Sequence, residues 1–138
     1  MFLLNYKLLW KLANLVILIL LIGLLLLPPE WLFSNYIKDL PELLSDKMIH
    51  IGVFILWACW LSGQFVSFLK IFFYTSIFGL LIEVFQYFLP YRSWELLDLL
   101  ANEIGILIGI IIAIKFTSGW SLLIENYISH FYDGEKNG

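Results

Sequence analysis

The sequence predicts an all-α membrane protein: a bundle of four transmembrane helices with a C-terminal amphipathic interfacial helix. The chain is 62% hydrophobic and only 14% charged, with a mean hydropathy of +0.91. A soluble domain is about half apolar and about a quarter charged, so the excess apolar surface must face lipid. The apolar residues also gather into four long stretches, separated by short polar or proline-containing segments.

Each stretch is long enough to cross a bilayer, because a span needs about 20 residues for ~30 Å of hydrocarbon. The predicted spans are about residues 8–27, 48–69, 71–89 and 96–116. Lys7 and Lys11 precede the apolar run Leu15–Leu27 of the first span and no small-residue cleavage site follows it, so we expect an uncleaved signal anchor. Lys70 alone separates the second and third spans, which predicts a tight hairpin. The whole chain, 1–138, is expected to form one domain.

The distribution of basic residues predicts the orientation of the spans. With the N-terminus inside, the inner side carries five lysines and the outer side three basic residues, namely Lys7, Lys11, Lys70, Lys115 and Lys136 against Lys38, Lys47 and Arg92. The excess of positive charge lies on the cytoplasmic side of membrane proteins. We therefore expect a multi-pass protein of the cytoplasmic membrane with both termini inside. Three tryptophans fall near predicted boundaries, as interfacial tryptophans do: Trp31, Trp94 and Trp120.

Two segments outside the spans are predicted to lie on the membrane surface. Residues 31–44 place apolar side chains at roughly helical spacing and form the outer candidate. Residues 120–132 predict an amphipathic helix on the inner surface. Its apolar face comprises Trp120, Leu123, Ile124, Tyr127, Ile128 and Phe131.

Polar groups at membrane depth are the candidate functional residues, since a charge there costs ~2.5–3.5 kcal/mol even on the lenient insertion scale. Asp46 and His50 stand four residues apart and are expected to pair on one helix face. The alternative is that Asp46 caps the helix and His50 only packs. Glu83 and Gln86, three apart, are expected to point inward. The alternative for Glu83 is a protonated carboxyl, or one paired with Lys47 or Arg92.

The segment that follows adds an arginine and a polar stripe. Arg92, in the predicted outer loop, has the planar fork that clamps phosphate or carboxylate, or it serves as an interfacial anchor. Asp98, Asn102, Gly105 and Gly109 follow one another at steps of four, three and four on one face of the fourth span. The two glycines match the small-xxx-small pattern that lets helices approach closely.

The alternation of the spans places these polar residues together. The start of the second span, the end of the third and the start of the fourth lie on one side of the membrane, which the charge bias makes the outer side. A shared polar site is therefore predicted from Asp46, Lys47, His50, Glu83, Gln86, Arg92, Asp98 and Asn102.

The composition also excludes some classes of function. Basic residues form no patch, which gives nucleic-acid binding no support. One cysteine, Cys59, and two histidines leave no set for a Cys/His zinc site. We expect no cofactor and no metal. The expected partners are membrane lipids, including a lipid-linked cell-wall precursor, and further copies of the chain.

Three motifs in order resemble the VanZ family of membrane proteins. Asp46–Phe54 resembles that family's D-K-x-x-H-x-x-x-F segment, and Glu83–Gln86 its E-x-x-Q. Arg92 followed by Asp98–Gly105 resembles its R and D-x-x-x-N-x-x-G. The match covers residues 46–109. The resemblance implies an envelope protein linked to resistance to the glycopeptide teicoplanin, but it supplies no reaction.

Three functions remain open. In the first, a non-enzymatic site binds a lipid-linked or anionic headgroup through Lys47, Gln86, Arg92 and Asn102, or the cluster only stabilises the bundle. In the second, a membrane enzyme acts on a polyprenyl-phosphate or phospholipid headgroup. Its candidate catalytic groups are His50, Asp46, Glu83 and Asp98. Glu83 or Asp98 would be a second acid/base or a divalent-metal ligand. The third is a small transporter, for which four helices leave little room.

Overall fold

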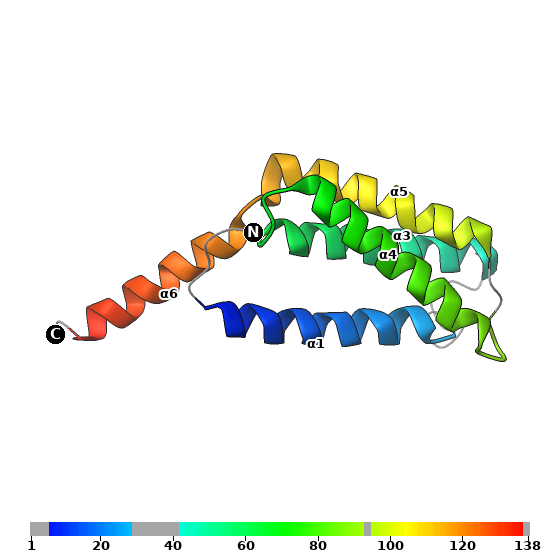
Figure 1. Cartoon of the computed structure of the whole chain (residues 1–138), viewed down its shortest axis with the longest axis horizontal. Helices are drawn as coiled ribbons and strands as arrows, with labels where there is room; N and C mark the ends of the chain where they lie inside the picture. The colour runs from blue at the N-terminus through cyan, green and yellow to red at the C-terminus, as the bar shows by residue number, and fades with distance from the viewer. Residues whose placement is uncertain (1–5, 29–41, 93–94, 137–138) are drawn as a thin grey trace.

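The computed structural model describes residues 6–28, 42–92 and 95–136, and every element in these ranges is helical (Figure 1). The elements are α1 (Lys7–Leu26), α3 (Glu42–Ser62), α4 (Phe68–Tyr87), α5 (Leu96–Ile112), the π-helical segment η1 (Ala113–Thr117) and α6 (Trp120–Lys136). The first four helices run alongside one another, and α6 projects away from them (Figure 1). The prediction of an all-α fold is confirmed.

Three of these helices are long and apolar enough to cross a membrane: α1, α4 and the continuous helix Leu96–Thr117. The chain is therefore a multi-pass membrane protein. Helix α3 stands where the second span was predicted, but Glu42, Asp46 and Lys47 occupy its first six residues and shorten its apolar stretch.

The predicted hairpin at Lys70 is wrong. Helix α3 ends at Ser62, and Lys70 lies in the first turn of α4. The turn lies at residues 63–67, where the amides of Gly63 and Gln64 donate to the carbonyls of Trp60 and Leu61. Phe65 and Val66 keep this stretch apolar, so hydropathy alone extended the second span through it.

The core is centred on α3, which shares its most extensive interface with α5. Two glycines of α5 permit this contact. A Cβ on Gly105 would lie 2.5 Å from the carbonyl oxygen of Ile51, and one on Gly109 would lie 2.8 Å from that of Ile55. Because backbone cannot move aside as a flexible side chain can, a larger residue at either position would push the helices apart. Both glycines thus lie at the helix contact that their spacing predicts.

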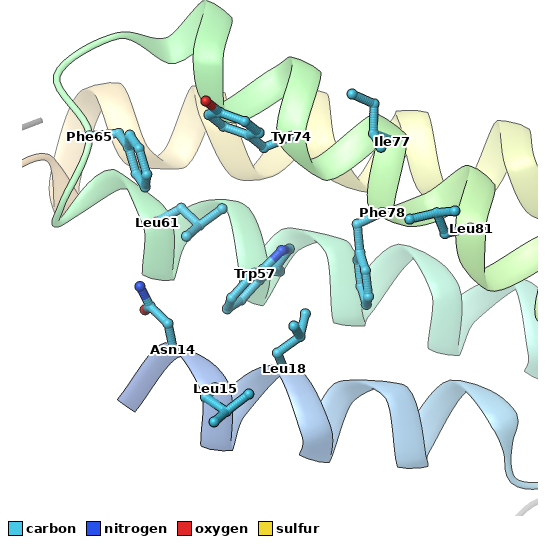
Figure 2. A pocket seen from close by; sticks show the side chains of 10 residues that line it. All are labelled: Asn14, Leu15, Leu18, Trp57, Leu61, Phe65, Tyr74, Ile77, Phe78 and Leu81. Atoms are coloured by element: carbon cyan, nitrogen blue, oxygen red, sulfur yellow. The ribbon is translucent and has the colours of Figure 1, made fainter. Parts of the chain in front are cut away.

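Helix α1 packs less closely, and a cavity of about 490 Å³ lies between it and helices α3 and α4 (Figure 2). Its lining is apolar apart from Asn14 and Tyr74. Trp57, Leu61 and Phe78 project into the space between the helices (Figure 2). The cavity thus has the chemistry of the hydrocarbon around it rather than that of a polar site.

The end of the bundle at which α1 begins is closed by tryptophans and buried amides. Trp10, Trp60 and Trp120 pack together with ring centroids 4.8–6.2 Å apart. The Asn14 amide donates to Gln64 Oε1, and Asn14 Oδ1 accepts from Gln64 Nε2 and Trp60 Nε1, at 2.7–2.8 Å. This group of five side chains is called the aromatic end below.

Helix α6 starts from the aromatic end. Gly119, at φ 72°, makes the sharp turn into it, and its amide donates to the carbonyl of Ser62. Glu125 of this helix is buried and accepts hydrogen bonds from Trp10 Nε1 and the amide of Tyr6. Leu123 and Tyr127 are exposed. Helix α6 covers the predicted range 120–132. Its place on the membrane surface stays a prediction.

Other predictions fall outside the described residues. These are the outer surface segment 31–44, of which only the backbone of 42–44 is described, and the interfacial tryptophans Trp31 and Trp94.

Candidate functional site

The end of the bundle opposite the aromatic end brings the predicted site residues together. The start of α3 supplies Asp46, Lys47 and His50; the end of α4 supplies Glu83 and Gln86; the start of α5 supplies Asp98 and Asn102; and Arg92 lies between α4 and α5. This follows from the antiparallel order of α3, α4 and α5, which places those three ends side by side. These eight residues and Glu95 are called the polar cluster below.

Both basic side chains of the polar cluster are held by carboxylates. Lys47 Nζ lies 2.6 Å from Glu95 Oε2 and also contacts Asp98 Oδ1. Arg92 Nη1 lies 2.6 Å from Asp46 Oδ1. Lys47 is 14% exposed and Arg92 7%, so both ion pairs are largely withdrawn from water. Buried charges of this kind need such partners.

Arg92 also connects the cluster to α1. Its Nη2 donates to the carbonyl oxygens of Leu25 at 3.0 Å and Leu27 at 2.6 Å. The Gln86 amide donates to the same Leu25 carbonyl at 2.9 Å. The last carbonyls of a helix have no partner within the helix, so these side chains satisfy groups that would otherwise be unpaired.

His50 lies at the centre of the cluster and is fully buried. Its Nδ1 is 2.8 Å from Asn102 Oδ1, and its Nε2 is 3.5 Å from the Gln86 amide nitrogen. Since Asn102 Oδ1 can only accept, this contact requires a proton on Nδ1. The contact therefore orients the imidazole ring between α3 and α5.

Several buried polar atoms around His50 have no hydrogen-bond partner among the described residues. They include both carboxylate oxygens of Glu83, Gln86 Oε1 and Asn102 Nδ2. Glu83 is fully buried, and its Oε1 points toward His50, 3.7 Å from Nδ1. Most buried polar atoms in proteins are paired, and those that are not call for an explanation such as a bound ion or water.

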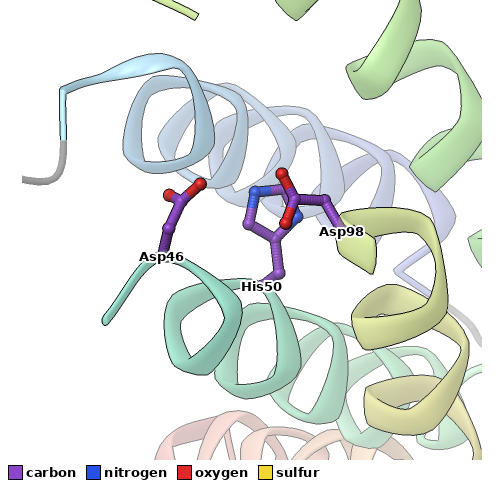
Figure 3. Close-up of side chains that lie close together, drawn as sticks. All are labelled: Asp46, His50 and Asp98. Atoms are coloured by element: carbon purple, nitrogen blue, oxygen red, sulfur yellow. The ribbon is translucent and has the colours of Figure 1, made fainter. Parts of the chain in front are cut away.

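Two carboxylates have other partners than the pairings that the sequence suggested. Asp46 forms an ion pair with Arg92 rather than an exclusive pair with His50. Glu83 is not held by Lys47 or Arg92, because both bind other carboxylates. Asp46 still lies near His50: ligand-type atoms of Asp46, His50 and Asp98 all lie within 4.8 Å of one another. Figure 3 shows both carboxylates turned toward the imidazole.

Sequence reasoning missed one member of the cluster and one anchor. Glu95 pairs with Lys47, although it stands just before α5, where it reads as an ordinary solvated residue. Its position three residues before Asp98, on the side that carries Lys47, was an available signal. The carbonyls of Leu25 and Leu27 carry no signal in the sequence, because backbone groups are the same at every position.

The family of the chain agrees with this arrangement. The model of the VanZ/LLP1 family matches residues 3–118. No curated protein and no solved structure matches the chain. The matched region includes the whole polar cluster and every candidate span, and the chain therefore belongs to the VanZ/LLP1 family.

Proposed function

We propose that this chain is a cell-envelope protein of the cytoplasmic membrane whose polar cluster binds the anionic headgroup of a lipid-linked ligand at the extracytoplasmic surface. The observation that carries the proposal is the convergence of eight predicted polar residues from α3, α4, α5 and the loop before α5 at one end of a membrane bundle. Groups so costly to bury are retained in membrane proteins mainly where they bind or move something.

Helix α3 acts as the fourth span. Helix α1 ends at the polar cluster, since Arg92 binds the carbonyls of Leu25 and Leu27, whereas α4 begins at the aromatic end after the turn at 63–67. The chain can connect these two points only by crossing the bundle, and α3 is the crossing. Its polar first turns then lie at the headgroup level, where charge is tolerated.

The rim of the cluster has the groups that a headgroup needs. The rim side chains are partly exposed: 14% for Lys47, 14% for Asp46 and 35% for Glu95. The side chains of His50 and Glu83 are fully buried. Lys47 and Arg92 offer charged donors suited to phosphate. The ligand that fits this membrane surface is a lipid-linked cell-wall precursor, and through it the protein would influence susceptibility to teicoplanin.

Native mass spectrometry of the purified protein with its co-purified lipids tests the proposal. Wild type should retain a phosphorylated polyprenyl lipid selectively, and the variant His50→Ala/Arg92→Ala should lose it. Lys115→Ala, in the π-helical segment η1 at the aromatic end, is the matched control and should bind as wild type does. Identical, unselective lipid profiles for folded wild type and double variant would refute a headgroup site.

A second candidate is a purely structural cluster, and the ion pairs favour it: each basic side chain already has a carboxylate partner. The two readings differ in one result, because a structural cluster predicts unselective lipid retention in stable wild-type protein. The enzymatic alternative assigns acid/base chemistry to His50. It predicts headgroup turnover that His50→Ala and Arg92→Ala both abolish.

A further inference from the structure

The polar cluster contains more acid than base. Among the described side chains, four carboxyl groups (Asp46, Glu83, Glu95 and Asp98) face two basic groups (Lys47 and Arg92). Acidic side chains thus outnumber basic ones by two in a largely buried volume. An anionic headgroup alone would increase this imbalance, whereas one divalent cation would cancel it.

We infer that Asp46, His50 and Asp98 bind a divalent transition-metal cation such as Zn²⁺ or Mn²⁺. The inference deepens the proposed function and rests on it only for the role of the ion toward a headgroup. It departs from the expectation, drawn from the sequence, that the protein has no metal.

The donor geometry supports the site. One ligand atom from each of the three residues lies within 4.8 Å of the others. Atoms bound to one tetrahedral ion at about 2.1 Å lie about 3.4 Å apart, so the separations between the three donors must shrink by up to about 1.4 Å. The known ion pairs use Oδ1 of Asp46 and Oδ1 of Asp98, and each carboxylate has a second oxygen. The imidazole and carboxylate donors together suit first-row divalent ions.

The orientation of His50 is an independent sign. Its Nδ1 lies 2.8 Å from Asn102 Oδ1 and its Nε2 lies 3.5 Å from the Gln86 amide nitrogen, so Nε2 is the ring atom that an ion would take in place of that long contact. Metal-binding histidines are held in this way, with one ring nitrogen bonded to a carbonyl or carboxylate and the other on the ion. Asn102 is thus a positioning residue for the site.

The unpartnered Glu83 carboxylate is a second sign. It is fully buried, has no hydrogen-bond partner among the described residues, and lies 3.7 Å from His50 Nδ1. An unpaired buried carboxylate is costly, and a nearby cation offsets that cost without a direct bond. With an ion in place, a headgroup phosphate would meet one more positive charge at the rim formed by Lys47 and Arg92.

Metal content measures the site directly. Purified protein free of histidine tags is stripped with chelator, incubated with Zn²⁺ or with Mn²⁺, desalted and analysed by native mass spectrometry. Wild type should retain about one ion per chain, and the ion should raise its unfolding temperature. His50→Ala and Asp46→Asn should retain less than about a tenth of that, and Asn102→Ala should bind about 10–100-fold more weakly.

Glu103→Gln is the matched control. Glu103 lies on α5, the helix that carries Asp98 and Asn102, but its carboxylate accepts a hydrogen bond from Ser76 of α4. This variant should bind the ion as wild type does. Asp46→Asn decides the matter if His50→Ala fails to fold, since Asp46 lies at the rim. Wild type that retains no ion, or Asp46→Asn that retains it fully, would overturn the inference.

Lipid retention with and without chelator separates this inference from the proposed function. Selective retention of phosphorylated lipid by ion-free wild type, with no ion bound on loading, would reject the metal site and keep the headgroup site. One bound ion with unselective lipid retention would keep the metal site and reject the headgroup site. Retention that chelation abolishes supports both.

Discussion

Single buried side chains at the aromatic end show how strongly this bundle depends on paired polar groups. Asn14, Gln64 and Trp60 exchange three hydrogen bonds of 2.7–2.8 Å, and Gln64 is 1% exposed. Asn14 and Trp60 are half-buried. Removing one member therefore leaves the other two with unmet donors and acceptors.

Asn14→Leu tests this dependence. The substitution keeps the volume but leaves Gln64 and the Trp60 indole unpaired, so the protein should lose about 1–3 kcal/mol of stability. Denaturant unfolding in detergent micelles measures it, with Asn126→Leu on the exposed side of α6 as control. Equal stability of the Asn14 variant and wild type would show that the amide group contributes nothing net.

At the scale of elements, the contact between α3 and α5 fixes the position of the polar cluster. The contact carries the cluster residues at one end and Gly105 and Gly109 along the rest. Close approach at the glycines brings the first two turns of α5 against the second and third turns of α3, where Lys47 meets Asp98 and His50 meets Asn102. The packing motif and the polar site are thus parts of one interface.

Gly105→Ala should disturb that interface, because its methyl group would lie 2.5 Å from the Ile51 carbonyl oxygen. We expect a loss of about 1–3 kcal/mol, typical of overpacking, and weaker ligand binding at the cluster. Gly52→Ala is the control, since nothing lies within 4 Å of its added methyl. It should be neutral or stabilising because alanine is the better helix former. Equal effects of the two substitutions would contradict the account.

At the scale of the whole molecule, the order of the spans sets which surface carries the site. Connectivity places the ends of α1 and α4 and the starts of α3 and α5 together, while η1 and α6 lie at the aromatic end. The excess of lysines at the aromatic end predicts that the N-terminus lies inside, and in that orientation the polar cluster would face outward and α6 would lie in the cytoplasm.

Reporter fusions test this orientation. A fluorescent protein fused after residue 136 should fluoresce, and alkaline phosphatase fused after residue 92 should be active, because the first folds in the cytoplasm and the second needs oxidation outside. Alkaline phosphatase fused after residue 66, in the turn between α3 and α4, is the control and should be inactive. The opposite pattern would place the cluster on the cytoplasmic face.

How much of this was readable from the sequence depends on how local each signal is. The long apolar runs predicted the helices, and their alternation predicted that Asp46, His50, Glu83 and Asn102 would meet. The turn at 63–67 was not predicted because Phe65 and Val66 keep the local hydropathy high. The ion-pair partners were not predicted either. Whether Asp46 pairs with Arg92 depends on distances between helices, which the order of residues along the chain does not give.

The central claim is that the polar cluster recognises a charged headgroup, and competition between lipids of equal chain length tests it most directly. Purified, delipidated wild type is offered equal amounts of a polyprenyl phosphate and the corresponding polyprenyl alcohol, and native mass spectrometry reads the bound species. We expect a preference for the phosphate of at least about tenfold, or about 1.4 kcal/mol, that Arg92→Ala removes and Lys115→Ala keeps. Equal binding of phosphate and alcohol by folded wild type would contradict it and leave the cluster a structural one.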